Sequence, residues 1–198
     1  IHGLLDLSVQ PNKKTLNIEK IDTLRSLYIV SYKSKTKNLQ TLFSSRNLQQ
    51  LIMVMGNQKS LDGIEKSEKL QILYLYYARS LQDISALEKV KKTLKVLCLN
   101  HCPKIEDYSV LEKMENFQTL MIYGNHKISD IQFISKIKSL KRFRFSVNIL
   151  DGDLSPCLKL EEATSMTNRK HYNLKDEELP KNYDCPFGNE GIEEWMLY

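Results

Sequence analysis

Leu70-Gln-Ile-Leu73-Tyr-Leu75 follows the pattern L-x-x-L-x-L, and this pattern specifies the fold. It returns at Leu94-Lys-Val-Leu97-Cys-Leu99 and at Phe117-Gln-Thr-Leu120-Met-Ile122. Eight units begin with such an opening residue, at intervals of 20 to 24 residues: Leu4, Leu24, Leu48, Leu70, Leu94, Phe117, Leu140 and Leu160. An internal period of this length is typical of arrays in which each unit buries its apolar edge against the next unit.

A second phrase, I-x-D-I-x-x-L, lies between the opening patterns. Its three best copies are Leu81-x-Asp83-Ile84-x-x-Leu87, Ile105-x-Asp107-Tyr108-x-x-Leu111 and Ile128-x-Asp130-Ile131-x-x-Ile134. The opening pattern and its spacing resemble the leucine-rich repeat family, and the second phrase is similar to its short bacterial repeats of the internalin type. The resemblance implies a strand in the first half of each unit and a short turn in the second half, capped by the shared aspartate.

The resemblance implies an α/β fold, a leucine-rich repeat solenoid. It would have a concave parallel β-sheet of about eight strands, short 3-10 or helical turns on the convex side, and a C-terminal cap. We expect the array to span residues 1–172. Residues 173–198 hold seven acidic residues against Lys175 and Lys181, and we expect an acidic C-terminal cap or a binding tail there, with Tyr172, Phe187 and Trp195 as apolar cap residues.

Composition narrows the possible classes of protein. The 198 residues are 41% hydrophobic, which is enough for one continuous repeat stack, and no apolar run is long enough to predict a membrane span. The net charge of +5 is mild and spread along the chain, without a basic stripe, so nucleic-acid binding is not expected. Four cysteines are too few for a disulfide framework and favour reduced thiols.

Alternation along a strand predicts which residues face outward from the array. With the opening residue counted as the first, the third, fifth and seventh residues of each unit should form the concave face, while the fourth and sixth point into the core. The middle of this outward face is unusually apolar, and exposed apolar area of this kind is typical of interaction sites. The predicted partner-binding residues are Tyr28, Ile52, Val54, Ile72, Tyr74, Tyr76, Val96, Met121, Tyr123, Arg142 and Arg144.

Two alternative origins of the apolar strip stay open. Strand propensity alone favours Tyr, Val and Ile, and one of the chain ends could fold over the face. Arg142 and Arg144 are expected beside the strip, where they could contact carboxylate or phosphate groups of a partner.

Nothing in the sequence indicates an enzyme, a metal site or a cofactor. The chain lacks P-loop, dinucleotide-binding, HExxH and GxSxG motifs. Cys98 has no base predicted beside it, and His101 and His126 fall at similar loop positions in successive units, which repeat register explains.

The leading hypothesis is therefore a bacterial protein–protein interaction module that binds another protein through its concave face, as an antitoxin-like immunity protein or an adaptor in the cytoplasm. The alternative is a secreted or surface protein of the internalin kind that contacts a host. The chain begins at Ile1 rather than Met, so a processed or trimmed N-terminus is expected. The sequence leaves the oligomeric state open.

Overall fold

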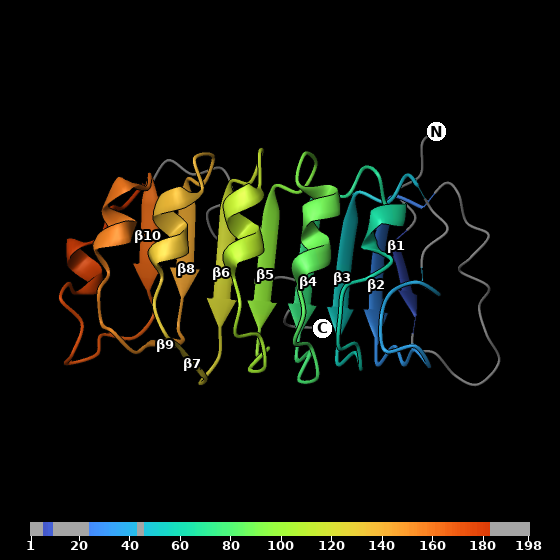
Figure 1. Cartoon of the computed structure of the whole chain (residues 1–198), viewed down its shortest axis with the longest axis horizontal. Coiled ribbons are helices and arrows are strands. Elements are labelled where there is room, and N and C mark those ends of the chain that lie inside the picture. Colours follow the sequence, from blue (N-terminus) through green and yellow to red (C-terminus); the bar gives the residue numbers. More distant parts are fainter. Residues whose placement is uncertain (1–5, 10–23, 43–45, 183–198) are drawn as a thin grey trace.

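A computed structural model describes residues 6–9, 24–42 and 46–182. Eight parallel strands lie side by side in one sheet, in chain order, and short helical turns cover one face of it (Figure 1). The strands are β1 (Asp6–Val9), β2 (Ser26–Val30), β3 (Gln50–Val54), β4 (Ile72–Tyr76), β5 (Val96–Asn100), β6 (Thr119–Tyr123), β8 (Arg142–Phe145) and β10 (Glu162–Ser165). The leucine-rich repeat solenoid expected from the sequence is confirmed.

Each strand begins at the third residue of its unit, where the side chains start to alternate. In β3 and β4 the fourth and sixth residues are buried, and the third, fifth and seventh are half-buried. The core is continuous along the array because Leu51, Leu73, Leu97 and Leu120 stand in register on neighbouring strands. Each unit thus buries its apolar edge against the next, as the repeat pattern requires.

The convex side consists of short 3-10 turns. They are η2 (Ile64–Lys66), η3 (Ser85–Val90), η4 (Ser109–Lys113), η5 (Gln132–Lys136) and η6 (Ser155–Lys159), with η7 (Asp176–Glu178) beyond the last strand. Units of 20 to 24 residues leave no room for longer helices. The apolar residues of the second phrase, such as Ile84 and Leu87, are buried beneath these turns.

The aspartate of the second phrase caps each turn, as predicted. Asp83, Asp107, Asp130 and Asp153 each accept the backbone N–H of the residue two positions later, at 2.8 to 3.0 Å. An aspartate favours this local bond because its short side chain reaches the amide without distorting the backbone. The bond satisfies one of the amides left without a partner at the start of a helical turn.

A corner in the left-handed backbone region follows β2, β3, β4, β5 and β6. It is the eighth residue of each unit: Ser31, Met55, Tyr77, His101 and Gly124. In Met55, Tyr77 and His101 the backbone N–H donates to the last carbonyl of the neighbouring strand at 2.7 to 2.8 Å. The corner therefore extends the sheet ladder by one bond before the chain turns toward the convex side.

Two regions depart from the regular unit. The described parts of residues 31–47 contain turns and bends and no helix or strand, with Leu39 and Leu42 filling the core in place of a 3-10 turn. At the other end, a small two-stranded sheet joins β7 (Lys127–Ile128) to β9 (Asn148–Ile149). The irregular loop after β2 agrees with the imperfect repeat pattern there.

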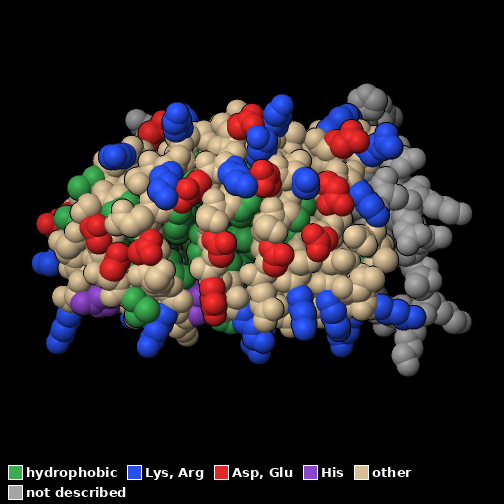
Figure 2. Space-filling view, in the orientation of Figure 1, with side chains coloured by type: hydrophobic (Ala, Val, Ile, Leu, Met, Phe, Trp, Pro, Cys, Tyr) green, Lys and Arg blue, Asp and Glu red, His purple; other side chains and the backbone are tan. Residues whose placement is uncertain are grey.

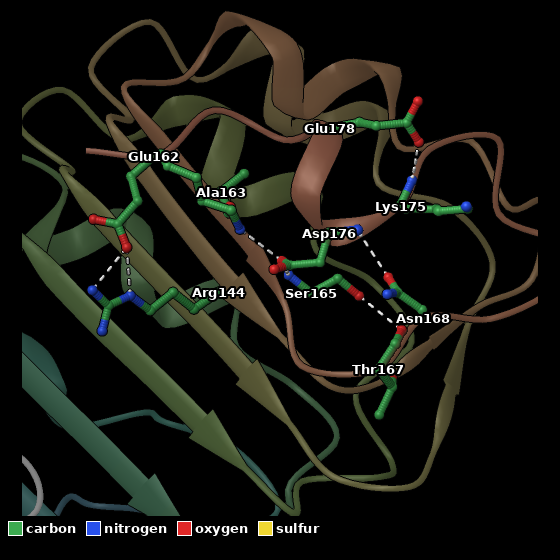
Figure 3. Close-up of polar contacts among 10 residues, drawn as sticks. Arg144, Glu162, Ala163, Ser165, Thr167, Asn168, Lys175, Asp176 and Glu178 are labelled. Atoms are coloured by element: carbon green, nitrogen blue, oxygen red, sulfur yellow. Dashed lines mark hydrogen bonds and ion pairs between the residues drawn. The ribbon is translucent and has the colours of Figure 1, made fainter. Parts of the chain in front are cut away.

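The far edge of β10 is covered by the residues that follow it (Figure 3). The N–H of Ala163 donates to the carbonyl of Pro180 at 2.8 Å, and the N–H of Ser165 donates to Oδ1 of Asp176 at 2.7 Å. Nζ of Lys181 donates to the carbonyl of Ala163 at 3.0 Å and pairs with Asp176 at 2.8 Å. These bonds protect an edge that would otherwise present unpaired backbone groups.

The predicted cap residues fall partly within the described chain. The hydroxyl of Tyr172 donates to the carbonyl of Val147 and accepts the N–H of Ile149, both at 3.1 Å. Phe187 and Trp195 lie outside the described residues, and the division at residue 172 stays a prediction. In the described ranges, no helix combines the length and the apolar character needed to cross a membrane.

Candidate functional site

The concave sheet brings the predicted binding residues together. The fifth residues align in one row across the strands, from Tyr28 through Ile52, Tyr74, Cys98 and Met121 to Arg144. A second row joins Val54, Tyr76, Asn100 and Tyr123, and a third joins Ile72, Val96, Thr119 and Arg142. We call these residues the concave strip. Neighbouring members are one strand apart, about 4.8 Å.

Most side chains of the concave strip are half-buried, whereas Met121 and Cys98 are almost completely buried. Ten of the eleven predicted binding residues have intermediate exposure, whereas Met121 is 3% exposed and the neighbouring Cys98 is 2% exposed. The expectation that Met121 offers free surface is therefore wrong. Cys98 and Met121 are neighbours in the middle of the fifth-residue row, between Tyr74 and Arg144.

Three tyrosines, Tyr74, Tyr76 and Tyr123, lie together in the middle of the strip. The rings of Tyr74 and Tyr76 meet edge to face, with centroids 6.3 Å apart. Burial, followed by the charge interaction with Cys98, raises the pKa of Tyr74, Tyr76 and Tyr123. The three hydroxyls therefore stay protonated at neutral pH and can donate hydrogen bonds to a partner.

The cysteine at the centre of the strip lacks the properties of a nucleophile. Burial raises the pKa of the Cys98 thiol to about 12, and the side chain of Tyr76 hydrogen-bonds to it. Burial also raises the pKa of Cys102 to about 12, and its thiol donates to the carbonyls of Leu75 and Asn100 at 3.6 Å. Since the thiolate is the reactive form, both thiols are chemically quiet and serve the packing.

The two arginines at the end of the strip share an acidic neighbour, Glu162, that was not among the predicted site residues. Figure 3 shows its contact with Arg144. Glu162, with a side chain only 6% exposed, accepts Nε of Arg144 at 2.8 Å and pairs with Arg142 at 3.6 Å. The two guanidinium groups share one carboxylate, which leaves one positive charge. Glu162 is the third residue of the last unit and stands directly opposite Arg142, so the same register would have identified it.

That Arg142 and Arg144 contact a partner stays a prediction, and their low exposure restricts how a partner could reach them. Their side chains are 14% and 25% exposed, for Arg142 and Arg144 respectively. A partner carboxylate would have to compete with Glu162 for hydrogen-bond donors that are already oriented. Nε of Arg142 and Oε2 of Glu162 are buried without a hydrogen-bond partner among the described residues, so the Arg144–Glu162 bond is the better formed of the two contacts.

A second surface, not predicted from the sequence, borders the strip where the strands end. Met55 and Tyr77, the corner residues after β3 and β4, are 53% and 40% exposed. The ring of Tyr77 stacks on His101 at 4.8 Å, and the guanidinium of Arg79 lies 6.0 Å from the Tyr77 ring centre. The signal was present in the repeat: the eighth residue of each unit directly follows the outward seventh.

His101 and His126 lie near each other without forming a metal centre. Burial, and then the charge interaction with His101, lowers the pKa of His126, so this ring is neutral at pH 7. His101 shares a hydrogen bond with the side chain of Asn100. Within the described ranges, no group of three or more His, Cys, Asp or Glu side chains is placed to hold a metal ion.

Comparison with known proteins supports the fold. The sequence matches no family model and no curated protein. Among solved structures, internalin C2 from Listeria monocytogenes is similar, with a TM-score of 0.59 and 23% identity over 75% of this chain. An internalin, InlF, from the same organism has a TM-score of 0.54 and 20% identity over 77% of this chain. The chain spans 64% of the first structure and 51% of the second. The sheet, the turns and these likenesses show that the chain has a leucine-rich repeat fold like that of the internalin structures.

Proposed function

We propose that this chain is a protein-recognition module that binds a partner protein on the concave strip. The observation that carries the proposal is the set of half-buried tyrosine and aliphatic side chains between Tyr28 and Tyr123, on the face of the sheet opposite the 3-10 turns of the described chain. Large aromatic side chains with a polar tip dominate the energetics of protein interfaces.

The rigidity of the strip supports binding rather than mere strand propensity. Tyr74 and Tyr76 are held by each other and by the hydrogen bond between Tyr76 and Cys98. Side chains ordered before binding lose little conformational entropy when a partner arrives. The protonated tyrosine hydroxyls then add directional hydrogen bonds to the apolar contact.

The chemistry of the site favours binding over catalysis. The thiols of Cys98 and Cys102 have a raised pKa because they are buried. Neither has a histidine base among its hydrogen-bond partners within the described chain. The strip thus offers contact area and hydrogen bonds, which are the means of recognition.

Two settings could use such a surface. One is an antitoxin-like immunity protein or adaptor in the cytoplasm; the other is an internalin-like protein at the cell surface. The similar solved structures lend no support to the antitoxin-like role, and the likeness to internalins concerns the fold. A toxin gene beside this gene would favour the first setting, and a secretion signal in the full-length gene would favour the second.

The test replaces Tyr74 and Tyr76 together by Asp. Partners are captured from a lysate of the source organism with the unmodified chain, identified by mass spectrometry, produced separately and titrated by calorimetry. We expect the double variant to weaken binding of the purified partner by at least about a hundredfold, because two charges would be buried at an interface.

Leu158→Asp is the matched control. Leu158 is an exposed apolar residue on η6, 51% exposed, on the opposite side of the molecule. The control should bind as the unmodified chain does, and circular dichroism should show the same fold in all three proteins. A purified partner that binds the Tyr74/Tyr76 variant with unchanged affinity would contradict the proposal.

A further inference from the structure

The loops that follow β2, β3, β4, β5 and β6 together carry more basic than acidic side chains, unlike the loop after β8. We call these loops the loop edge: residues 31–37, 55–60, 77–82, 101–106 and 124–129, between the end of a strand and the next aspartate or turn. They contain one acidic residue, Glu106, and seven basic ones, all exposed: Lys33, Lys35, Lys37, Lys59, Arg79, Lys104 and Lys127. Figure 2 shows Lys and Arg side chains gathered along the edge at which the strands end.

The basic side chains of the loop edge have no acidic partner in the described part of the chain. Among the residues that the structure describes, none of the seven takes part in an ion pair. On the turns, by contrast, lysines pair with glutamates of the neighbouring unit: Lys91 with Glu115, Lys113 with Glu88, and Lys136 with Glu112. The same stacking of units that brings opposite charges together on the turns brings like charges together on the loop edge.

Backbone contacts place the basic residues in adjacent loops. The N–H of Lys59 donates to the carbonyl of Lys37 at 2.7 Å, and the N–H of Asp83 donates to the carbonyl of Lys59 at 3.0 Å. Successive loops are therefore about one strand spacing apart. Like charges at this spacing repel one another, and an acidic ligand would relieve that repulsion.

Exposed apolar and aromatic side chains lie within the same edge. Met55 and Tyr77 are exposed and stand at left-handed corners with φ of 56° and 54°, a region in which Gly or Asn is far better tolerated. Each such residue costs about 1 kcal/mol or more in backbone strain. Large side chains at strained, exposed corners do not serve the stability of the described array, so a contact outside the described residues accounts for them better.

We propose that the loop edge binds an acidic segment of a partner protein, one that carries several carboxylates and at least one apolar side chain. The carboxylates would contact Lys59, Arg79, Lys104 and Lys127, and the apolar side chain would lie on Met55 and Tyr77. The inference rests on the proposed function only in taking the partner to be a protein. It extends the binding surface from the concave strip to its neighbouring edge.

An acidic protein fits this edge better than a nucleic acid does. Asp83, Asp107 and Asp130 stand directly behind the basic loops and, with one oxygen free of the capping bond, would repel a continuous run of phosphates. Separate carboxylates on a peptide can meet the basic side chains and avoid the aspartates. Met55, an aliphatic side chain, also offers apolar contact rather than a stacking platform for bases.

The test selects phage-displayed random 12-residue peptides on the full chain. We expect enriched peptides to be rich in Asp and Glu with an apolar residue among them. The loop-edge variant Lys59→Glu, Arg79→Glu, Lys104→Glu, Lys127→Glu should bind the enriched peptides at least about tenfold more weakly, because four attractive charges become repulsive. Circular dichroism verifies that each variant is folded.

A turn-face variant with the same change in charge is the control. Lys89, Lys92, Lys138 and Lys159 are exposed lysines on the convex side, and their replacement by Glu should change the affinity less than about twofold. Enrichment of non-acidic peptides, no enrichment at all, or an equal loss of affinity in the control would overturn the inference. So would tighter binding of a 20-nucleotide single-stranded DNA than of the peptides, since the occupant would then be a nucleic acid.

The same peptides separate this inference from the proposed function. Binding that survives Tyr74→Asp with Tyr76→Asp, and is lost in the loop-edge variant, supports the loop edge even if the concave strip binds nothing. Binding that is lost in the tyrosine variant and survives in the loop-edge variant overturns the inference and leaves the concave strip as the site.

Discussion

The turns on the convex side and the loop edge are built from the same repeat, yet they treat charge and backbone strain in opposite ways. On the turns, aspartates cap amides and lysines pair with glutamates of a neighbouring unit. On the loop edge, basic side chains have no ion-pair partner within the described chain, and large residues occupy left-handed corners. The contacts on the turns stabilise the array, whereas the like charges and left-handed corners of the loop edge reduce its stability.

This contrast indicates where function lies in a repeat array. Stacking copies every favourable contact from unit to unit, so a contact that serves the fold recurs with its partner in place. A feature that recurs without a partner, such as the basic loops, is not explained by the fold. Measuring what each side contributes to the free energy of unfolding tests the contrast directly.

Asp107→Ala is expected to have the largest effect on stability. It removes the bond to the N–H of Ser109, 2.8 Å long, and should lower the free energy of unfolding by about 1 kcal/mol. The hydrogen bonds from Ser109 lower the pKa of the Asp107 carboxyl. A carboxyl with a lowered pKa stabilises the fold above its unfolded pKa, near 4, and loses that contribution as the pH decreases through the folded pKa.

Urea unfolding at pH 7 and at pH 3 measures this prediction. The difference between the variant and the unmodified chain should be largest at pH 7 and should shrink at pH 3. An equal difference at both pH values would mean that the carboxylate is not what stabilises the turn.

Lys136→Ala is expected to have a smaller effect. Its Nζ lies 3.0 Å from the carboxylate of Glu112 in the previous unit, at an exposed position, so the loss should be about 0.5 kcal/mol. Lys104→Ala on the loop edge is the matched substitution and should leave the free energy of unfolding unchanged. The urea midpoints of the two variants are measured at low salt and in 0.5 M salt. If Lys104→Ala destabilised the chain as much as Lys136→Ala, the proposed contrast between the turns and the loop edge would be wrong.

Tyr77→Asn should not destabilise the chain at all. Tyr77 has φ of 54°, and Asn adopts this region more readily, so the free energy of unfolding should stay within about 0.5 kcal/mol of the original or rise. Tyr77→Val is the control, because a β-branched residue is the least suited to a left-handed corner and should lower stability by about 1 kcal/mol or more. Thermal and urea unfolding measure the stability of both variants. An equal loss of stability in both would show that the stacking of Tyr77 on His101, rather than backbone strain, determines the stability of the corner.

Much of the fold could be predicted because the repeat register is local. The leucine spacing places Leu73, Leu97 and Leu120 in the core, and alternation places Tyr28, Tyr74 and Tyr123 on the opposite side of the same strands. The aspartate caps could be predicted for the same reason, since each bond joins residues two positions apart. Patterns that depend on neighbouring positions need no knowledge of the three-dimensional arrangement.

Parts of the candidate site could not be predicted from those patterns. Met121 has the outward register of its neighbours and is nevertheless 3% exposed, because exposure depends on the size of the side chains around it. The register places Glu162 opposite Arg142, but its hydrogen bond comes from Arg144, and that choice depends on the side-chain conformations rather than on the repeat. The corner at Tyr77 is strained only because the backbone there adopts a positive φ, which the Leu pattern does not encode.

The repeat, the direction in which each strand residue points and the capping of the turns all follow from the amino-acid order, because periodicity and short-range bonds produce them. Only the three-dimensional structure shows which outward residues are accessible and which charges of the described chain form ion pairs. Those properties depend on the stacking of units, which brings residues some two dozen positions apart to within one strand spacing. The free charges and strained corners of the loop edge emerge at that level.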